Sequence, residues 1–317
     1  MTIEQMQDEK AWLEMRMKGI GGSEASAVCG LNRYKSPHAL WLEKTNQVEH
    51  EDLSDNQYIY WGHKLEPVIA DWFTETTGKK VQRAGLMQSI ANPFMLASVD
   101  RLVVGENAGL EIKTASGYKS KEWQLDEVPD EYYIQCQHYM AVTGCDKWYI
   151  AVLIGGNNCI WKEIPRNDDD IKELIAIEKD FWYMVENNIE PPIDGSQAST
   201  EALNKKFIGG QKEPVELSST AEDKAKKLLE LQEQERNIKI DISLLQNEIK
   251  EEMGDNEEAY RGNYQFSWNT VKGRTSIDSK KLKQEKPDMI VKYVEKLMGQ
   301  GKPKGGLTLD FLVANGF

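Results

Sequence analysis

Three polar residues, Asp100, Glu111 and Lys113, have the types and the spacing of a metal-dependent hydrolytic site. They lie in the segment 96–115, LASVDRLVVGENAGLEIKTA, which reads as two short strands joined by a Gly/Asn turn, with Asp100 in the first strand. Side chains alternate between the faces of a strand, so Glu111 and Lys113 project together while Ile112 enters the core. A hard cation such as Mg²⁺ takes carboxylate oxygens and keeps several waters, so it would stabilise this arrangement. The segment predicts a metal-dependent phosphodiesterase centre.

Two predicted helices flank this segment, and each carries a candidate polar group. The first covers 61–77, with Glu66 in its first turn, where the carboxylate could favour the helix dipole or point at the metal. Its apolar residues form one stripe, made of Val68, Ile69, Trp72 and Phe73. The second helix covers 131–144, and on it Gln135 and Tyr139 are four residues apart and share a face.

A candidate anion-binding group lies near the N-terminus. Two glycines end a predicted helix over 8–18, and the following Ser23 is a good N-cap for a short helix over 24–29. A helix N-terminus with a Ser hydroxyl and glycines beside it can hold a phosphate, and Arg16 could close on the same anion. The alternative is that Ser23 only caps the helix and that Arg16 is solvated.

The order of elements predicts an α/β domain with one mixed sheet over residues 1–190. Strands are expected over 80–90, 94–104 and 109–115, a hairpin over 148–156 and 159–164, and a helix over 168–188. Residues 191–217 are rich in Gly and Pro and read as a linker. Residues 218–317 would form a C-terminal extension with a long helix over 218–252, a short hairpin over 259–271 and a basic tail with a helix near 287–299.

The long helix of this extension carries a heptad seam, on which Glu235 is the one polar break. The seam could pack on a neighbouring helix of the same chain or on a partner chain. Its apolar positions are Leu228, Leu231, Ile238, Ile242, Leu245 and Ile249.

Composition and charge exclude several classes of protein. The net charge of −13 argues against a nucleic-acid coat protein, which would be basic overall, but it leaves room for an enzyme with a locally basic groove. The four Cys and four His residues are scattered without the spacing of a zinc site. The apolar runs are far shorter than the roughly 20 residues that cross a bilayer. The N-terminus lacks the build of a signal peptide, so a cytoplasmic location and no membrane partner are expected.

An Asp on one strand followed by Glu-x-Lys on the next is the signature of the PD-(D/E)xK nuclease core. The chain resembles the YqaJ-type viral recombinase family, relatives of the lambda phage exonuclease, over about residues 8–190. The matching pieces are WLEMRMKGIGGSEASAVCGLN, YWGHKLEPVIADWF, MLASVDRLV, GLEIKT and YYIQCQHYMAVTG. This resemblance implies a PD-(D/E)xK restriction-endonuclease-like core, with a mixed central sheet flanked by helices. The helical C-terminal extension, which the periodicity predicts, is absent from the minimal nuclease. It also implies a Mg²⁺-dependent 5′-to-3′ double-strand DNA exonuclease that leaves 3′ single strands.

Carried over residue by residue, the resemblance assigns the metal centre. Asp100 and Glu111 would ligate Mg²⁺, for which Mn²⁺ can substitute, and the backbone carbonyl of Ile112 would be a further ligand. Glu66 would be an additional carboxylate near the metal. Lys113 would orient or deprotonate the attacking water and offset the charge of the transition state.

The resemblance also assigns residues around the metal. Gln135, with Gln137 as a second candidate, would orient the site and contact the nucleotide. Tyr139 completes the Gln-x-x-x-Tyr motif of the family, and structural and catalytic roles both stay open for it. Arg16 and Ser23 would hold the 5′-terminal phosphate.

The partners implied by the resemblance are double-stranded DNA ends and a single-strand annealing protein, in a bacterial or phage-infected cytoplasm. Family members often form trimeric rings around DNA, so a homo-oligomer is expected. Two alternative functions remain. One is a structure-specific DNA endonuclease of the same fold, and the other is a non-catalytic recombination scaffold that acts through the heptad helix.

Overall fold

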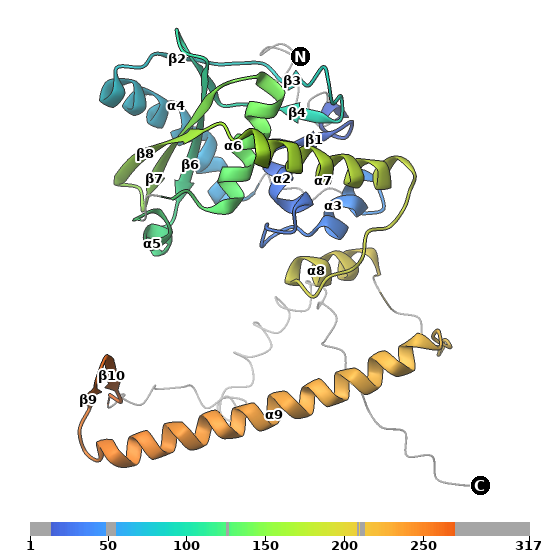
Figure 1. Cartoon of the computed structure of the whole chain (residues 1–317), viewed down its shortest axis with the longest axis vertical. Coiled ribbons are helices and arrows are strands. Elements are labelled where there is room, and N and C mark those ends of the chain that lie inside the picture. Colours follow the sequence, from blue (N-terminus) through green and yellow to red (C-terminus); the bar gives the residue numbers. More distant parts are fainter. Residues whose placement is uncertain (1–13, 49–54, 125–126, 208, 210–212, 270–317) are drawn as a thin grey trace, which may run out of the picture. The chain divides into compact units, whose positions relative to one another are not determined.

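The structure is a computed structural model that describes residues 14–48, 55–124, 127–207, 209 and 213–269 (Figure 1). The chain divides into two compact units, Met1–Ile208 and Gly209–Phe317. The first unit holds the sheets and helices that form the candidate site. Within the described ranges, no helix combines the length and the apolar character that crossing a membrane requires.

A five-stranded mixed sheet forms the centre of the first unit, with the strand order β2-β5-β6-β7-β8. β6 and β7 are parallel and pair from Ala108↔Lys147 to Ala115↔Ile154, whereas the other neighbours are antiparallel. A parallel pair needs a crossover connection, which helix α6 (Asp130–Thr143) supplies here. The strands are β2 (Val81–Gln82), β5 (Arg101–Val103), β6 (Ala108–Ala115), β7 (Lys147–Ile154) and β8 (Asn158–Pro165).

The two faces of this sheet pack against different helices. Trp148 and Ile150 of β7 pack in the same cluster as α6, whereas the alternating Tyr149 packs with helix α4 (Gln57–Thr77). On β6, Leu110 and Ile112 belong to the α4 side. Strand alternation therefore sends Glu111 and Lys113 to the α6 side, as the sequence predicts.

A second, three-stranded sheet has the order β1-β4-β3 and contributes residues to the candidate site. Its strands are β1 (Ile20–Gly21), β3 (Met87–Gln88) and β4 (Met95–Ala97), and β1 runs parallel to β4. The single strand predicted over 94–104 is therefore wrong, because β4 and β5 belong to different sheets. Asp100 lies in the bend between them, where its Oδ2 accepts the Ile112 N–H at 2.7 Å.

Four helices pack beside the small sheet: α2 (Gly22–Val28), α3 (Pro37–Lys44), α7 (Asp168–Glu186) and α8 (Gln197–Lys206). Their shared core includes Trp41 of α3, Phe181 of α7 and Ala202 of α8. α8 falls inside the segment predicted as a linker, and Ser199 on it hydrogen-bonds Ser36 across 2.8 Å. The small, buried residues Ala198, Ser199 and Ala202 thus pack α8 against the first unit, although Gly and Pro surround the helix in the sequence.

Other predicted elements form with shifted limits. α4 begins at Gln57, capped by the side chain of Asn56, and ends at Gly78 with φ of 72°. Ile69 and Phe73 of its predicted stripe are buried, but Val68 is 59% exposed, because adjacent helical residues point about 100° apart. Two short helical elements that the sequence did not predict follow β6, namely η2 (Gly117–Lys119) and α5 (Ser120–Gln124).

The second unit contains helix α9 (Thr220–Met253) and the hairpin of β9 (Glu258–Arg261) and β10 (Tyr264–Ser267). Most of the predicted heptad seam is exposed, including Ile238 and Leu245. Both alternatives for the seam, packing on a helix of the same chain or on a partner chain, therefore stay predictions. The basic tail with its predicted helix near 287–299, and the start of the predicted helix 8–18, lie outside the described residues.

Candidate active site

A cavity of about 760 Å³ opens beside the bend between β4 and β5. Its walls come from both sheets and from α2, α4 and α6, which are distant in sequence. The structure brings most of the sequence-predicted site residues to this cavity: Arg16, Ser23, Glu66, Asp100, Glu111, Lys113, Gln135 and Tyr139. His63 and Arg83, which sequence reasoning did not select, also line it.

Glu111 is a buried carboxylate of the cavity that two side chains contact. Its Oε1 lies 2.6 Å from Lys113 Nζ and accepts a hydrogen bond from Gln135 Nε2 at 2.8 Å. Its Oε2 is buried and, in the described part of the chain, has no hydrogen-bond partner. An unpartnered buried carboxylate oxygen is costly, so this atom is a candidate cation ligand.

The charges in the cavity shift the protonation of Asp100 and Lys113. Burial raises the pKa of Asp100 well above its ordinary value, and the neighbouring charges of Glu111 and Glu66 add to this. Burial lowers the pKa of Lys113, but the charges of Glu111 and Asp100 outweigh burial and raise it overall. Lys113 therefore holds its proton on Nζ, and the ammonium also lies 5.3 Å from the centre of the Tyr132 ring.

The chemistry of these donors fits Mg²⁺. Among the described residues, no three His, Cys, Asp or Glu side chains form a group that could hold a metal ion. The candidate donors are two carboxylates, Asp100 and Glu111, and the carbonyl of Ile112. Mg²⁺ is usually held by one or two carboxylates and retains waters, which matches this small oxygen-only set. A cation would also engage Glu111 Oε2 and relieve the repulsion that raises the pKa of Asp100.

Glu66 has a partner that sequence reasoning missed. Its Oε1 forms an ion pair with Arg101, whose side chain is only 7% exposed and also donates to the Asp100 carbonyl at 2.6 Å. Because α4 begins at Gln57, Glu66 is not in the first turn, so of the two alternatives for Glu66 the interaction with the helix dipole is wrong. Glu66 borders the cavity as the partner of a buried guanidinium.

Tyr139 supports Gln135, the residue that holds Glu111. Gln135 Nε2 lies 2.9 Å from Tyr139 Oη, and Tyr139 Oη donates to the Ser98 carbonyl at 3.0 Å. The predicted shared face of these two side chains is confirmed. A Cβ added to Gly22 would lie 2.3 Å from the Tyr139 ring, so the close approach of α2 requires glycine there. These contacts give Tyr139 a structural role.

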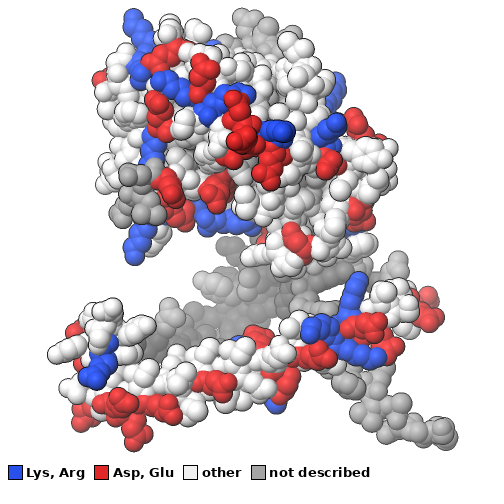
Figure 2. All heavy atoms as spheres, viewed as in Figure 1, with Lys and Arg blue, Asp and Glu red and all other residues white. Residues whose placement is uncertain are grey.

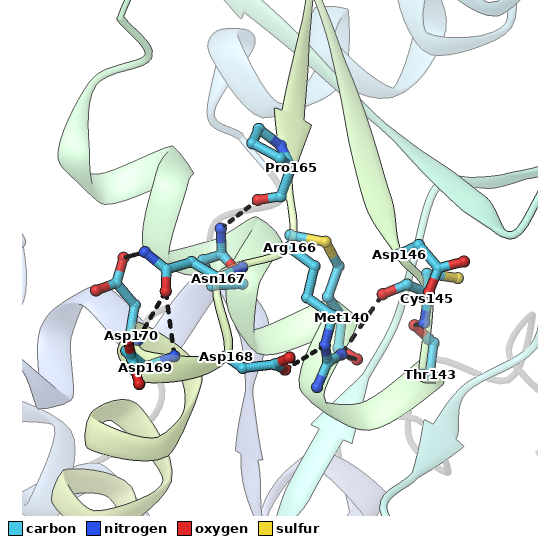
Figure 3. A network of polar contacts seen from close by, with 12 residues as sticks. Met140, Thr143, Cys145, Asp146, Pro165, Arg166, Asn167, Asp168, Asp169 and Asp170 are labelled. Atoms are coloured by element: carbon cyan, nitrogen blue, oxygen red, sulfur yellow. Dashed lines mark hydrogen bonds and ion pairs between the residues drawn. The ribbon is translucent and has the colours of Figure 1, made fainter.

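Gln137 does not face the cavity, so the proposal that it contacts a nucleotide is wrong. Its Nε2 donates to the Pro165 carbonyl at 2.9 Å, and its Oε1 accepts the Asn167 N–H at 3.0 Å. Figure 3 shows the same junction, where Arg166 donates to the Met140 carbonyl at the end of α6. Gln137 therefore joins α6 to the segment between β8 and α7.

Arg16 and Ser23 meet where the start of α2 lines the cavity. Arg16 Nη2 donates to Ser23 Oγ at 3.2 Å and forms an ion pair with Glu24 at 3.0 Å. Ser23 is not the N-cap that the sequence suggested, because α2 begins at Gly22 and Gly21 is in the capping position. On the face shown in Figure 2, basic and acidic side chains are interspersed over the first unit. That face has no broad basic surface, so an anion in the cavity would depend on local cationic groups such as Arg16.

Comparison with known proteins places this arrangement in a family. The model of the YqaJ-like viral recombinase domain matches residues 11–146. The uncharacterized protein YqaJ of Bacillus subtilis (strain 168) is 41% identical over 286 residues, which cover 89% of each chain. This chain belongs to the YqaJ-like viral recombinase family. The matched domain contains Arg16, both candidate metal carboxylates and Gln135, so the resemblance seen in the sequence is confirmed.

A solved structure shows the same fold. The crystal structure of an alkaline exonuclease (LHK-Exo) from Laribacter hongkongensis is similar with a TM-score of 0.51 and 22% identity. The similarity covers 57% of this chain and 94% of that chain. It confirms the predicted mixed α/β core with a central sheet flanked by helices.

Proposed function

We propose that this protein is a Mg²⁺-dependent exonuclease that degrades one strand of double-stranded DNA from its 5′ end and leaves 3′ single strands for recombination. Membership of the viral recombinase family and the fold shared with a protein described as an alkaline exonuclease support this function. The observation that carries it is the unpartnered, buried Oε2 of Glu111 beside Asp100, in a cavity that Arg16 also lines.

Asp100, Glu111 and the Ile112 carbonyl would hold the Mg²⁺ ion. When bound, the ion supplies a Lewis acid for a phosphodiester oxygen and lowers the pKa of a coordinated water. The chain fixes both carboxylates beforehand, since the Ile112 N–H holds Asp100 and Gln135 holds Glu111. Such preorganised groups lose little free energy by reorganising during the reaction.

Lys113 supplies positive charge next to the carboxylates. Its raised pKa keeps the proton on Nζ, so the ammonium can orient a water or offset negative charge that develops on the phosphate. The alternative role, removing a proton from the attacking water, requires a neutral amine. A cation bound by Asp100 and Glu111 would offset the carboxylate charges that raise the pKa of Lys113, so it would favour the neutral amine. Both roles are therefore proposed for Lys113, as a base and as an electrostatic stabiliser.

Arg16 and Ser23 would bind the phosphate at the 5′ terminus. Guanidinium and hydroxyl groups are good donors to phosphate oxygens, and both line the same cavity as the carboxylates. A 5′-terminal phosphate held there would place a nearby phosphodiester bond at the metal centre. This arrangement supports attack from the 5′ end.

Digestion of a 5′-phosphorylated linear duplex tests the proposal. Wild-type protein with Mg²⁺ should release label from the 5′ end first, and Lys113→Ala should lose most of this activity. Lys147→Ala is the matched control, because Lys147 pairs in register with Ala108 at the opposite end of β6. Equal activity of the wild type and Lys113→Ala would overturn the assignment.

One further substrate and one binding measurement separate the alternatives. Cleavage of closed circular duplex would indicate an endonuclease, whereas resistance of circles supports an exonuclease. Absence of hydrolysis, together with calorimetry that finds no Mg²⁺ or Mn²⁺ binding dependent on Asp100, would indicate a non-catalytic scaffold.

A further inference from the structure

One Arg side chain of the cavity is not engaged by a carboxylate. The Lys and Arg residues that line the cavity are Arg16, Arg83, Arg101 and Lys113. Three of them form ion pairs, namely Arg16 with Glu24, Arg101 with Glu66 and Lys113 with Glu111. The side chain of Arg83 is exposed, and among the residues that the structure describes it has no hydrogen bond, ion pair or ring contact. Its guanidinium is therefore available to an anion that enters the cavity.

Strand pairing explains why Arg83 reaches the cavity. β2 pairs antiparallel with β5 through Val81↔Val103 and Gln82↔Leu102, so this register continued by one residue brings Arg83 opposite Arg101. Val81 and Val103 pack on the α4 side of the sheet, and residues two apart in a strand share a face. Arg83 therefore belongs to the part of the wall where Arg101 meets Glu66 of α4.

This part of the wall differs from the one proposed to hold the 5′-terminal phosphate. Arg16 and Ser23 meet at the start of α2, whereas Arg83 follows an edge strand of the five-stranded sheet. Its neighbour in the register, Arg101, donates to the Asp100 carbonyl at 2.6 Å. An anion bound by Arg83 would therefore lie beside the candidate metal carboxylates and not at the Ser23 hydroxyl.

The chemistry of an unpaired guanidinium fits a phosphodiester. Its planar fork of N–H donors matches the oxygens of a phosphate group, and binding there displaces only water and counterions, whereas a paired Arg must also share its carboxylate. The chain carries a net charge of −13, and Glu66, Asp100 and Glu111 all line this cavity. DNA is repelled by such charges, so a free cation among them has a large effect on its binding.

We propose that Arg83 binds an internal phosphodiester of the DNA beside the metal carboxylates, at a site separate from the one for the 5′-terminal phosphate. This inference rests on the proposed function of the cavity. A backbone contact positions DNA without reading its sequence, so Arg83 should contribute equally to duplexes of any sequence and with either kind of 5′ end. A solvated Arg with no role in binding would contribute to neither.

Equilibrium binding measures this contact without hydrolysis. A duplex with one hairpin-closed, labelled end and one open end, bearing a 5′ phosphate or a 5′ hydroxyl, is titrated in EDTA at several KCl concentrations and followed by fluorescence anisotropy. Arg83→Gln should raise both dissociation constants about tenfold, as expected for one lost hydrogen bond to a charged group. The slope of the logarithm of affinity against the logarithm of salt concentration should become shallower by about 0.9, as expected for one lost phosphate contact.

Two further variants control for the loss of charge. Lys80→Gln removes an exposed cation three positions away, and Lys80 is not among the described residues that line the cavity, so both the affinity and the slope should stay close to the wild type. Arg83→Lys keeps the charge but loses the fork of donors, so it should keep the slope and lose part of the affinity. Denaturant unfolding should give the same midpoint for all variants, because exposed side chains without partners contribute little to stability.

Each outcome decides the inference. Unchanged binding by Arg83→Gln, or an equal loss in Lys80→Gln, overturns it, because the charge would then act from no particular place. A loss confined to the 5′-phosphorylated duplex also overturns it and assigns Arg83 to the terminal phosphate. A wild-type protein that binds neither duplex overturns it whatever its hydrolytic activity. A protein that shows the expected pattern but hydrolyses no DNA with Mg²⁺ supports the inference while refuting the proposed nuclease function.

Discussion

Gln135→Leu tests whether the site depends on how Glu111 is held. Gln135 is 4% exposed and donates to Glu111 at 2.8 Å, with Tyr139 Oη 2.9 Å away. A hydrogen bond to a carboxylate contributes about 1.5–3 kcal/mol and a neutral one about 1 kcal/mol, so the free energy of unfolding should fall by about 2–4 kcal/mol. Groups that orient a metal ligand typically affect metal affinity or activity by about 10- to 100-fold, so that loss is expected per folded molecule.

Gln137→Leu is the matched control for this variant. Gln137 lies on the same helix, is 1% exposed and also makes two hydrogen bonds, but both lead to the segment before α7. It should lose a comparable free energy of unfolding, about 1–3 kcal/mol, while keeping wild-type activity per folded molecule.

Urea unfolding and initial rates over a Mg²⁺ titration, normalised to the folded fraction, compare the two variants. Gln135→Leu should shift the Mg²⁺ dependence, and Gln137→Leu should not. If both variants lost activity equally, the effect would come from the stability of α6, and the proposed support of Glu111 would be refuted.

Three other outcomes follow from the structure. Mg²⁺ should raise the melting temperature of the wild type, because a ligand that binds the folded state stabilises it, and Asp100→Asn should abolish this shift. Burial lowers the pKa of His138, but Glu178 outweighs burial and raises the pKa overall. The ion pair therefore stabilises the fold fully below the pKa of an unfolded His, about 6.5, and this stabilisation is lost as the pH rises through the pKa of His138 in the folded protein. Unfolding measured between pH 6 and 9 should show this loss, and Glu178→Gln should flatten it. Gly22→Ala should destabilise the fold by about 1–3 kcal/mol, because the new Cβ would overlap the ring of Tyr139 on α6. Gly62→Ala is the control in the same unfolding assay, because its Cβ would meet no atom closer than 3.9 Å and should not destabilise the fold.

The parts of the site that the sequence predicted depend on local periodicity. Strand alternation placed Glu111 and Lys113 on one face, and helical spacing placed Gln135 beside Tyr139, as the structure shows. The same reasoning could have excluded Gln137, because residues two apart on a helix point about 200° from each other. The resemblance to the family, not the spacing, suggested that residue.

The parts that the sequence missed depend on contacts between distant segments. Arg101 meets Glu66 from 35 positions away, and Lys44 meets Glu24 from another helix. From the local sequence alone, Glu24 would be assigned as a capping residue at a helix N-terminus, and Lys44 as a cation near a helix C-terminus. Neither assignment predicts the contact between them. The bend at Asp100 was missed for the same reason, since it arises where two separate sheets meet.

That bend links two segments of the cavity wall through backbone pairing. On one side of residues 98–100, β4 pairs with β1, which leads into the segment that carries Ser23. On the other side, β5 pairs with β6, which carries Glu111. Strand pairing therefore fixes the backbone of the segment that carries Ser23 relative to the backbone of the strand that carries Glu111. Under the proposed function, the phosphate-binding segment and the metal carboxylates would keep their separation when DNA of any base sequence binds.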